Sequence, residues 1–289
     1  MNATPRILMC RPEHYGIEYE INPWMRKDCG SDRERAIRQW ESLVAILREL
    51  GVSVELLEPR PGLPDMVFTA NAGLVHHSRF ISSHFRHRER QGETPYFEQW
   101  FLEHGFEIAD IYVRSRSANP AFEGAGDALY CGETLVAGYL NRSDISLHRF
   151  LGETLGSRVL SVELVDPYFY HLDTCFCPLA PGEAIYFRPA FDPYAQRALK
   201  EYVEHLIEVD EEDARRFGCN AVVVGKSVVI NAGCERLADT LRDHGYEVYS
   251  TDLSEFLKSG GSAKCLTLRL DGEEAASWRD EPAAESVYA

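Results

Sequence analysis

The strongest constraint on the fold is a unit that recurs five times along the chain. Each copy is an amphipathic helix, a short break that usually contains glycine, and then a strand. The copies are "AIRQWESLVAILRELGVSVELLE" (36–58), "TPYFEQWFLEHGFEIADIYV" (94–113), "HRFLGETLGSRVLSVEL" (148–164), "PYAQRALKEYVEHLIEVD" (193–210) and "CERLADTLRDHGYEVYST" (234–251). Glycine after the last helical turn is a common helix end, and β-branched residues favour strands. The recurrence predicts an array of similar units.

Strand-like stretches between these units supply the remaining strands. They are "VFTANAGLVHHSRFISS" (67–83), "ALYCGETLVAGYL" (128–140), "DTCFCPLAPGEAIYF" (173–187), "NAVVVGKSVVIN" (220–231) and "KCLTLRL" (264–270). Turn residues in "CGE", "PGE" and "GK" indicate hairpins. Ala128, Cys175, Asn220 and Cys265 are spaced by 47, 45 and 45 residues. We predict an α/β fold, a five-bladed pseudo-symmetric α/β-propeller of ββαβ-type units, closed by pairing of "KCLTLRL" with the N-terminal "RILMCRP".

A doubly wound sheet is the main alternative to this ring. It would alternate single strands with helices and would usually carry a glycine-rich phosphate loop. The segment "FEGAGDAL" (122–129) contains G-x-G but has no third glycine and no helix start after it. The ring of hairpin-containing units therefore fits the sequence better.

Length and charge limit the classes of protein. We predict one α/β-propeller domain over 1–270, followed by an acidic, loosely ordered tail over 271–289. The absence of a signal peptide or a membrane span favours the cytoplasm, where the eight cysteines would be reduced thiols. The net charge of −16 disfavours nucleic acid and anionic membranes as partners, because both require a basic footprint.

Several polar residues stand at the ends of apolar strands and could carry chemistry. His171 and Asp173 face the same side of a strand, and an aspartate can fix the tautomer of a histidine. Glu123 and Asp127 flank two glycines, and Asp65 precedes the first hairpin, which carries Asn71. Each pattern alone also fits an ordinary turn or a satisfied core residue.

A basic cluster follows the first hairpin, in "SSHFRHRERQGETPYF". Arg90 and its neighbours could lie in a solvated loop or could grip a carboxylate in a bidentate way. "EINPWM" and "GYLNRSD", which contain Asn22 and Arg142, are similar polar loops beside hydrophobic anchors. Neither the histidines of the cluster nor the single C-x-C at Cys175 has the spacing of a zinc site.

Cys265 follows two glycines near the end of the last repeat. A cysteine nucleophile with a histidine acid/base is a complete reaction plan. Carboxylates around it would bind a cationic group, and an arginine would bind an anionic one. A substrate such as arginine has both groups.

These motifs resemble the guanidino-group modifying superfamily, the pentein α/β-propellers, which includes arginine deiminase and dimethylarginine dimethylaminohydrolase. The likeness covers about 5–270 and is closest to bacterial arginine dihydrolases, a domain that some bacteria fuse ahead of an ornithine cyclodeaminase. The motifs are "ILMCRPEHY", "INPWM", "PDMVFTANAGLV", "RERQGETPYF", "FEGAGDAL", "FYHLDTCFCPLA" and "FLKSGGSAKCLTLR".

The resemblance implies roles for particular residues. Cys265 would be the nucleophile and His171 the acid/base, while Glu123 would hold the guanidinium and Asp65 would line the pocket. Asn22, Asn71 and Arg90 match loops that bind and discriminate the substrate, and the assignment extends to Asp127, Asp173 and Arg142. An asparagine at the position of Asn71 goes with dihydrolysis, and a smaller residue goes with deimination.

The function that the resemblance implies is arginine dihydrolysis through a covalent thiouronium, without a metal or organic cofactor. Arginine deiminase or dimethylarginine dimethylaminohydrolase activity on the same scaffold is the nearest alternative. A non-catalytic propeller that binds a partner is a more distant one. We expect any cyclisation of ornithine to belong to another protein, and the oligomeric state, including a homo-oligomer, stays open.

Overall fold

The computed structural model describes residues 4–112 and 120–273, and their strands form five three-stranded sheets. The sheets are β15 (Leu268–Arg269), β1 (Arg6–Cys10) and β2 (Ser53–Leu57); β3 (Gly73–His76), β4 (Arg79–Ser82) and β5 (Glu107–Ile108); β6 (Ala128–Cys131), β7 (Thr134–Tyr139) and β8 (Arg158–Glu163); β9 (Phe176–Ala180), β10 (Glu183–Tyr186) and β11 (His205–Glu208); and β12 (Val222–Val224), β13 (Ser227–Asn231) and β14 (Glu247–Thr251).

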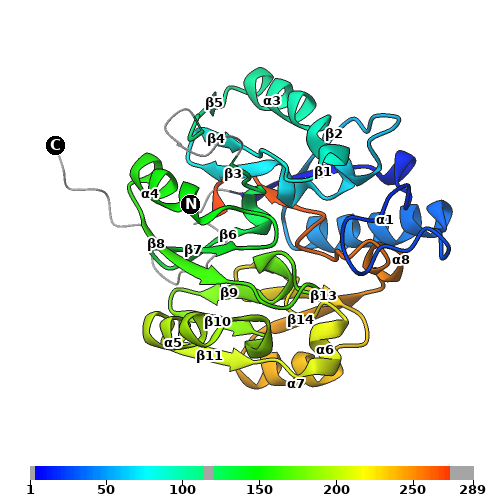
Figure 1. Cartoon of the computed structure of the whole chain (residues 1–289). Coiled ribbons are helices and arrows are strands. Elements are labelled where there is room, and N and C mark those ends of the chain that lie inside the picture. Colours follow the sequence, from blue (N-terminus) through cyan, green and yellow to red (C-terminus); the bar gives the residue numbers. More distant parts are fainter. Residues whose placement is uncertain (1–3, 113–119, 274–289) are drawn as a thin grey trace.

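The same topology repeats in every sheet. The first strand pairs antiparallel with the second, and a helix then leads to a third strand parallel to the second. The helices that make these crossings are α1 (Arg33–Glu49), α3 (Thr94–Glu103), α4 (His148–Leu155), α5 (Pro193–Tyr202) and α7 (Glu235–Asp243). Short helices α2 (Arg88–Gln91), α6 (Glu211–Arg215) and α8 (Ser254–Leu257) lie in the connections. The helices lie around the outside of the sheets (Figure 1).

Local sequence explains why each unit turns where it does. Gly156 adopts a left-handed conformation (φ 65°) at the end of α4, which stops the helix and directs the chain into β8. Gly132 (φ 62°) supplies the tight turn between β6 and β7, as the "CGE" motif predicts. The five predicted helix-strand units and the three predicted hairpin turns are therefore confirmed.

The two ends of the described chain meet in one sheet. β1 and β15 pair antiparallel, with Ile7 opposite Arg269 and Leu8 opposite Leu268. The predicted pairing of "RILMCRP" with the last strand is confirmed. The strand is shorter than the alternation after Cys265 suggests, because the main chain from Ser262 to Thr267 forms helical turns, in which Leu266 N donates to Ser262 O.

Only residues 271–273 of the predicted C-terminal tail belong to the part of the chain that the structure describes. Asp271 pairs with Arg269, and Glu273 is buried against Lys264, with 2.9 Å between Oε1 and Nζ. These two ion pairs hold residues 271–273 against the protein. The rest of the predicted tail, 274–289, lies outside the described residues.

Short turns precede the first strand of successive sheets and gather the polar residues of the repeats. The 3-10 turns Thr69–Ala72, Gly124–Gly126 and Leu172–Thr174 come before β3, β6 and β9. Turns ending at Asn220 and at Thr267 come before β12 and β15. Residues at equal places in different units therefore lie at the same end of their sheets. Within the described ranges, no helix has the length and apolarity needed to cross a membrane.

Candidate active site

A small cavity lies among these turns. Six of the ten predicted site residues line it: Asn22, Asp65, Asn71, Arg90, Arg142 and Cys265. The other four, Glu123, Asp127, His171 and Asp173, are buried behind the wall. The structure thus brings together residues from segments as distant in sequence as 22 and 265.

Cys265 presents its thiol to this cavity from the turn before β15. Its Sγ donates to Oδ2 of Asp173 at 3.3 Å and accepts a hydrogen bond from Nδ2 of Asn220 at 3.1 Å. Burial, together with the nearby Asp173 carboxylate, raises the pKa of the Cys265 thiol well above its ordinary value. The thiol is therefore neutral in the empty site. A cation brought into the cavity would favour the thiolate.

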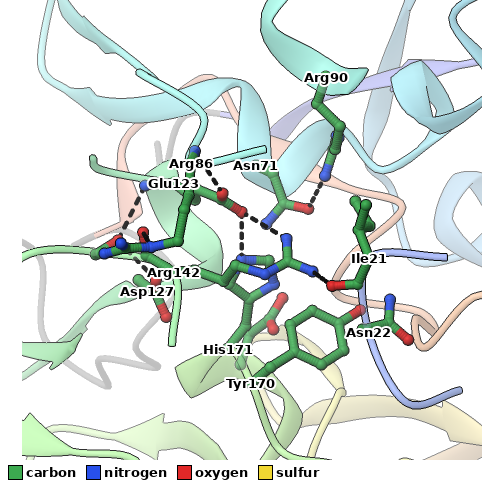
Figure 2. A network of polar contacts seen from close by, with 12 residues as sticks. Ile21, Asn22, Asn71, Arg86, Arg90, Glu123, Asp127, Arg142, Tyr170 and His171 are labelled. Atoms are coloured by element: carbon green, nitrogen blue, oxygen red, sulfur yellow. Dashed lines mark hydrogen bonds and ion pairs between the residues drawn. The ribbon is translucent and has the colours of Figure 1, made fainter. Parts of the chain in front are cut away.

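His171 is held by a carboxylate on the far side of its ring. Its Nε2 lies 2.7 Å from Oε2 of Glu123, and the same oxygen accepts from Nη1 of Arg142 at 3.1 Å (Figure 2). Burial alone would raise the pKa of Glu123, but Arg142 and His171 outweigh it and hold that pKa well below the ordinary value. Glu123 is therefore a carboxylate, and its Oε2 fixes the orientation of the His171 ring.

The second oxygen of Glu123 is also occupied. Oε1 accepts from the backbone N–H of Arg86 at 3.1 Å, and Glu123 does not line the cavity. Each oxygen of Glu123 thus has a protein partner, and the prediction that Glu123 holds the guanidinium stays a prediction. Glu123 contacts the cavity wall through Arg142.

Asp127 has a supporting position rather than a place on the wall. Oδ1 accepts from the backbone N–H of Leu172 at 3.1 Å, and Oδ2 accepts from Oγ of Ser143 at 2.6 Å. Burial raises the pKa of Asp127 to about 6, although His171 opposes the shift. Asp127 thus fixes the segment that carries His171, and its predicted contact with substrate stays a prediction.

Arg90 connects three polar groups on another side of the cavity. It pairs with Glu93 through two hydrogen bonds of 2.9 and 2.8 Å, donates to Oδ1 of Asn71 at 2.8 Å, and donates to the backbone O of Asp65. Its guanidinium also lies 4.5 Å from the ring centroid of Phe85. The buried Arg90 therefore fixes the orientation of the Asn71 amide, with the N–H end directed away from Arg90 (Figure 2).

Among the described residues, several buried polar atoms have no hydrogen-bond partner, and three of these atoms belong to predicted site residues. They are Oδ1 of Asp65, Nδ2 of Asn71 and Oδ1 of Asp173. Burial raises the pKa of Asp65 and, despite the opposing charge of Lys264, raises the pKa of Asp173 to about 7. Unsatisfied buried polar atoms are costly, so they indicate groups that await a ligand. The two carboxyl oxygens suit the N–H donors of a cationic, nitrogen-rich group, and the N–H of Asn71 suits an acceptor atom.

Asn22 lines the cavity but uses its side chain to shape a loop. Oδ1 accepts from the backbone N–H of Trp24, and Nδ2 donates to the backbone O of Ser259. The adjacent Ile21 O accepts from Nη2 of Arg142 at 2.9 Å (Figure 2). This loop therefore forms one wall of the cavity, and Asn22 anchors it.

Sequence reasoning missed four residues of the site. Tyr170 lies under Arg142, 4.5 Å from ring centroid to Cζ, and its hydroxyl donates to Gly260 O. Asn220 contacts the thiol, Glu93 neutralises Arg90, and Gly126 leaves room for Asn71. Only Asn220 had a signal, the 45-residue step to Cys265. The described residues include no group of three or more His, Cys, Asp or Glu side chains placed to hold a metal ion.

Five repeated sheets whose turns surround a thiol, a His–Glu pair and unsatisfied carboxylates define a protein of the guanidino-group modifying, pentein type. Comparison with known proteins makes this specific. A family model described as "N,N dimethylarginine dimethylhydrolase, eukaryotic" matches residues 11–271. The chain belongs to the dimethylarginine dimethylaminohydrolase family.

Three relatives are similar to this chain over most of its length. The bifunctional arginine dihydrolase/ornithine cyclodeaminases ArgZ of Synechocystis and AgrE of Nostoc are 47% and 45% identical over 92% and 100% of this chain. The chain spans only 37% and 40% of their length. The N(G),N(G)-dimethylarginine dimethylaminohydrolase of Mycobacterium tuberculosis is 42% identical over 92% of this chain and 86% of its own.

Two solved structures of the ArgZ N-terminal domain superpose on the chain with a TM-score of 0.87. One is an asparagine-to-serine variant covalently bonded to a reaction intermediate, 46% identical, covering 92% of this chain and 97% of that domain. The other is a cysteine-to-serine variant bound to substrate, 45% identical, covering 93% and 98%. The predicted resemblance to penteins and arginine dihydrolases is confirmed.

Proposed function

We propose that the chain is an arginine dihydrolase, which converts L-arginine and two waters into ornithine, carbon dioxide and two ammonia molecules. The observation that carries the proposal is the Cys265 thiol beside a cavity whose wall includes the unsatisfied Oδ1 of Asp65 and Nδ2 of Asn71. The identity to ArgZ and AgrE, which are named arginine dihydrolases, supports it.

In the proposed complex, the guanidinium of arginine lies against Asp65, whose unsatisfied Oδ1 accepts an N–H group. The amino-acid end lies toward Arg142 and the loop of Asn22, where a positive charge attracts the α-carboxylate. Arg90 contributes mainly through Asn71, because its own donors are taken by Glu93, Asn71 and Asp65 O. This arrangement places the guanidinium carbon beside Sγ of Cys265.

The first half-reaction forms a carbon–sulfur bond and breaks a carbon–nitrogen bond. The guanidinium cation favours the thiolate, and the thiol proton passes to Asp173, its hydrogen-bond acceptor. Cys265 attacks the guanidinium carbon, and His171, oriented by its hydrogen bond with Glu123, donates a proton to the departing ammonia. The product is a covalent thiouronium on Cys265.

The second half-reaction consumes water. His171, now neutral, takes a proton from a water that attacks the thiouronium carbon. Loss of the second ammonia, followed by a second water, releases ornithine and carbon dioxide and restores the thiol. The Nδ2–H of Asn71, directed by Arg90, orients the intermediate for this second loss.

A product assay tests the reaction. Incubation with L-arginine and separation by chromatography should yield ornithine and ammonia in a ratio of one to two. Citrulline that accumulates without ornithine would contradict dihydrolysis and would support arginine deiminase activity of the same site.

Hydrolysis of methylated arginine is the second candidate. The dimethylarginine dimethylaminohydrolase of M. tuberculosis supports it, because this chain covers most of that protein's length. Incubation with asymmetric dimethylarginine would then release dimethylamine. If dimethylamine forms faster than ornithine does from arginine, the methylated compound is the better substrate.

We further propose that the five sheets close into a ring, the five-bladed propeller, with the β1–β15 pairing as the joint. The eight free thiols fit a reducing compartment such as the cytoplasm. We propose a small guanidino compound as the ligand, with neither nucleic acid nor membrane as a partner.

A further inference from the structure

Asn220 occupies the place in its own unit that Cys265 occupies in the next, 45 residues later. It ends the turn before β12, as Cys265 lies in the turn before β15. The side chain of Asn220 is fully buried. A buried amide must satisfy two donors and one acceptor, so its partners indicate its role.

The carbonyl end of the Asn220 side chain holds the backbone of the cysteine turn. Oδ1 accepts from the backbone N–H groups of Ser262 and Cys265, both at 3.1 Å. The backbone O of Asn220 accepts from Lys264 N at 3.2 Å. Three hydrogen bonds from one residue thus fix the segment 262–265 on which the thiol stands.

The amide nitrogen of Asn220 reaches the reacting atom itself. Nδ2 donates to Sγ of Cys265 at 3.1 Å and to the backbone O of Asp173 at 3.0 Å. Asn220 therefore connects the thiol with the segment that carries both Asp173 and His171. The thiol in turn donates to Oδ2 of Asp173 at 3.3 Å, so the sulfur has one acceptor and one donor.

When the thiol loses its proton, its hydrogen bond to Asp173 as a donor is lost, but the bond from Asn220 remains. A hydrogen bond to the charged form of a group stabilises that form. An N–H donor forms a stronger hydrogen bond with an anionic acceptor than with a neutral one. We propose that Asn220 is a catalytic residue that donates its Nδ2–H to the Cys265 thiolate and holds the nucleophile turn through Oδ1. The proposal rests on the proposed role of Cys265 as nucleophile.

The role requires asparagine because the side chain must provide both an acceptor oxygen and an N–H donor. An aspartate at this position would keep the acceptor for Ser262 and Cys265 N–H, but would direct a second oxygen at the sulfur. Asn220→Asp therefore removes the donor with little change in shape. Asn220→Ala removes both ends.

Asn231 offers a matched control. It is also buried, its Oδ1 accepts from the backbone N–H of Leu253, and its Nδ2 donates to the backbone O atoms of Arg216 and Ala232. Asn231→Asp changes the same atoms in the same kind of setting, without a sulfur. Both aspartate variants should lower the melting temperature, but only one should affect the thiol.

The measurement is the rate of Cys265 alkylation by iodoacetamide against pH, in a Cys29→Ser background that removes the exposed cysteine. Peptide mass spectrometry identifies the modified residue. For Asn220→Asp and Asn220→Ala, the midpoint should rise by about one pH unit or more, which is roughly a tenfold lower rate at neutral pH. The midpoint of Asn231→Asp should equal that of the parent.

The outcomes separate this inference from the proposed function. If Cys265→Ser turns over arginine at the parent rate, the nucleophile assignment fails whatever Asn220 does. If Cys265→Ser is inactive but both folded Asn220 variants keep the parent midpoint and kcat, the role of Asn220 is overturned. A raised midpoint, with kcat reduced about 10²-fold and KM changed far less, supports it.

Discussion

Oε2 of Glu123 lies 2.7 Å from Nε2 of His171 and 3.1 Å from Nη1 of Arg142, so one carboxylate oxygen is shared by an acid/base and a fixed cation. The contacts of this oxygen distinguish a carboxylate that orients other side chains from one that is open to a ligand, which the sequence could not do. Glu123 orients His171, whereas Asp65 has an unsatisfied oxygen at the cavity wall.

Glu123→Gln should reduce kcat by about 10²-fold, because the His171 ring loses the carboxylate that orients it. It should also destabilise the protein by about 2–4 kcal/mol at neutral pH, because Arg142 stays buried without a partner charge. The ion pair between Arg6 and Glu55 offers a control, because both of its side chains are partly exposed. Glu55→Gln should therefore have little effect on stability. Arginine turnover and urea unfolding of both variants provide the measurements.

The pH dependence of the Glu123 contribution has a definite sign. The folded-state pKa of Glu123 is lowered, so its contribution to stability is present above the ordinary glutamate pKa and is lost as pH falls through the folded value. The stability gap between wild type and Glu123→Gln should be constant from pH 6 to 8 and should narrow below about pH 4. A gap that widens in acid would contradict the assignment.

Cys265→Ser should abolish turnover, with a loss of about 10³-fold or more, because serine at this site has no neighbouring base strong enough to ionise it. The variant should still bind arginine, as a rise in melting temperature with added arginine would show. Cys29→Ser, which changes an exposed thiol, should keep full activity. Equal activity of the two variants would remove Cys265 from the mechanism.

Gly126→Ala should disturb Asn71 rather than the fold. A Cβ at Gly126 would come within 2.2 Å of Nδ2 of Asn71, while Arg90 holds the other end of that amide. We expect kcat to fall about tenfold or more and the share of citrulline among the products to rise. Gly16→Ala is the control, since its nearest neighbour would be 3.9 Å away.

Asp127→Asn should flatten part of the pH dependence of stability. Burial raises the folded-state pKa of Asp127 to about 6, so its contribution is fully present below the unfolded pKa and is lost as pH rises through 6. Between pH 4 and 7, wild type should lose on the order of 2 kcal/mol relative to Asp127→Asn. If the free energies of unfolding of the two proteins change in parallel over this pH range, the carboxyl of Asp127 is not the source of the pH dependence.

Glu273→Gln should destabilise the protein by about 3 kcal/mol, because it leaves the buried Lys264 without its 2.9 Å partner. Lys264→Met in the same chain should recover much of the loss, since an apolar side chain needs no counter-charge. The double variant and the single variant are compared by urea unfolding. Additive losses would mean that the two residues do not act as a pair.

Much of the fold could be predicted from the sequence because the repeat depends on local sequence patterns. Helix periodicity, glycines after helices and turn residues between apolar runs depend on near neighbours, and they marked every crossing helix and three hairpins. The extent of β15 was overestimated, because hydrogen bonds from Asn220, 45 residues away, hold the preceding segment as a turn.

The site could be predicted less completely than the fold. Motifs identified Cys265, His171 and Asn71, but they could not show which carboxylates have unsatisfied oxygens. Asp127 and Glu123 look like equal candidates in "FEGAGDAL", and only the contacts of Ser143, Leu172 and Arg142 distinguish support from binding. Tyr170 and Glu93 were missed for the same reason, since both act through partners that tertiary structure supplies.

The pairing of β1 with β15 has a consequence for the order of events during synthesis. A ribosome delivers β1 first and keeps it without its antiparallel neighbour until Arg269 has emerged. Cys265 emerges just before Arg269, so a chain truncated before β15 contains His171 and the buried carboxylates but lacks the cavity thiol. Pairing of β1 with β15 and arrival of the thiol are therefore linked in time during synthesis.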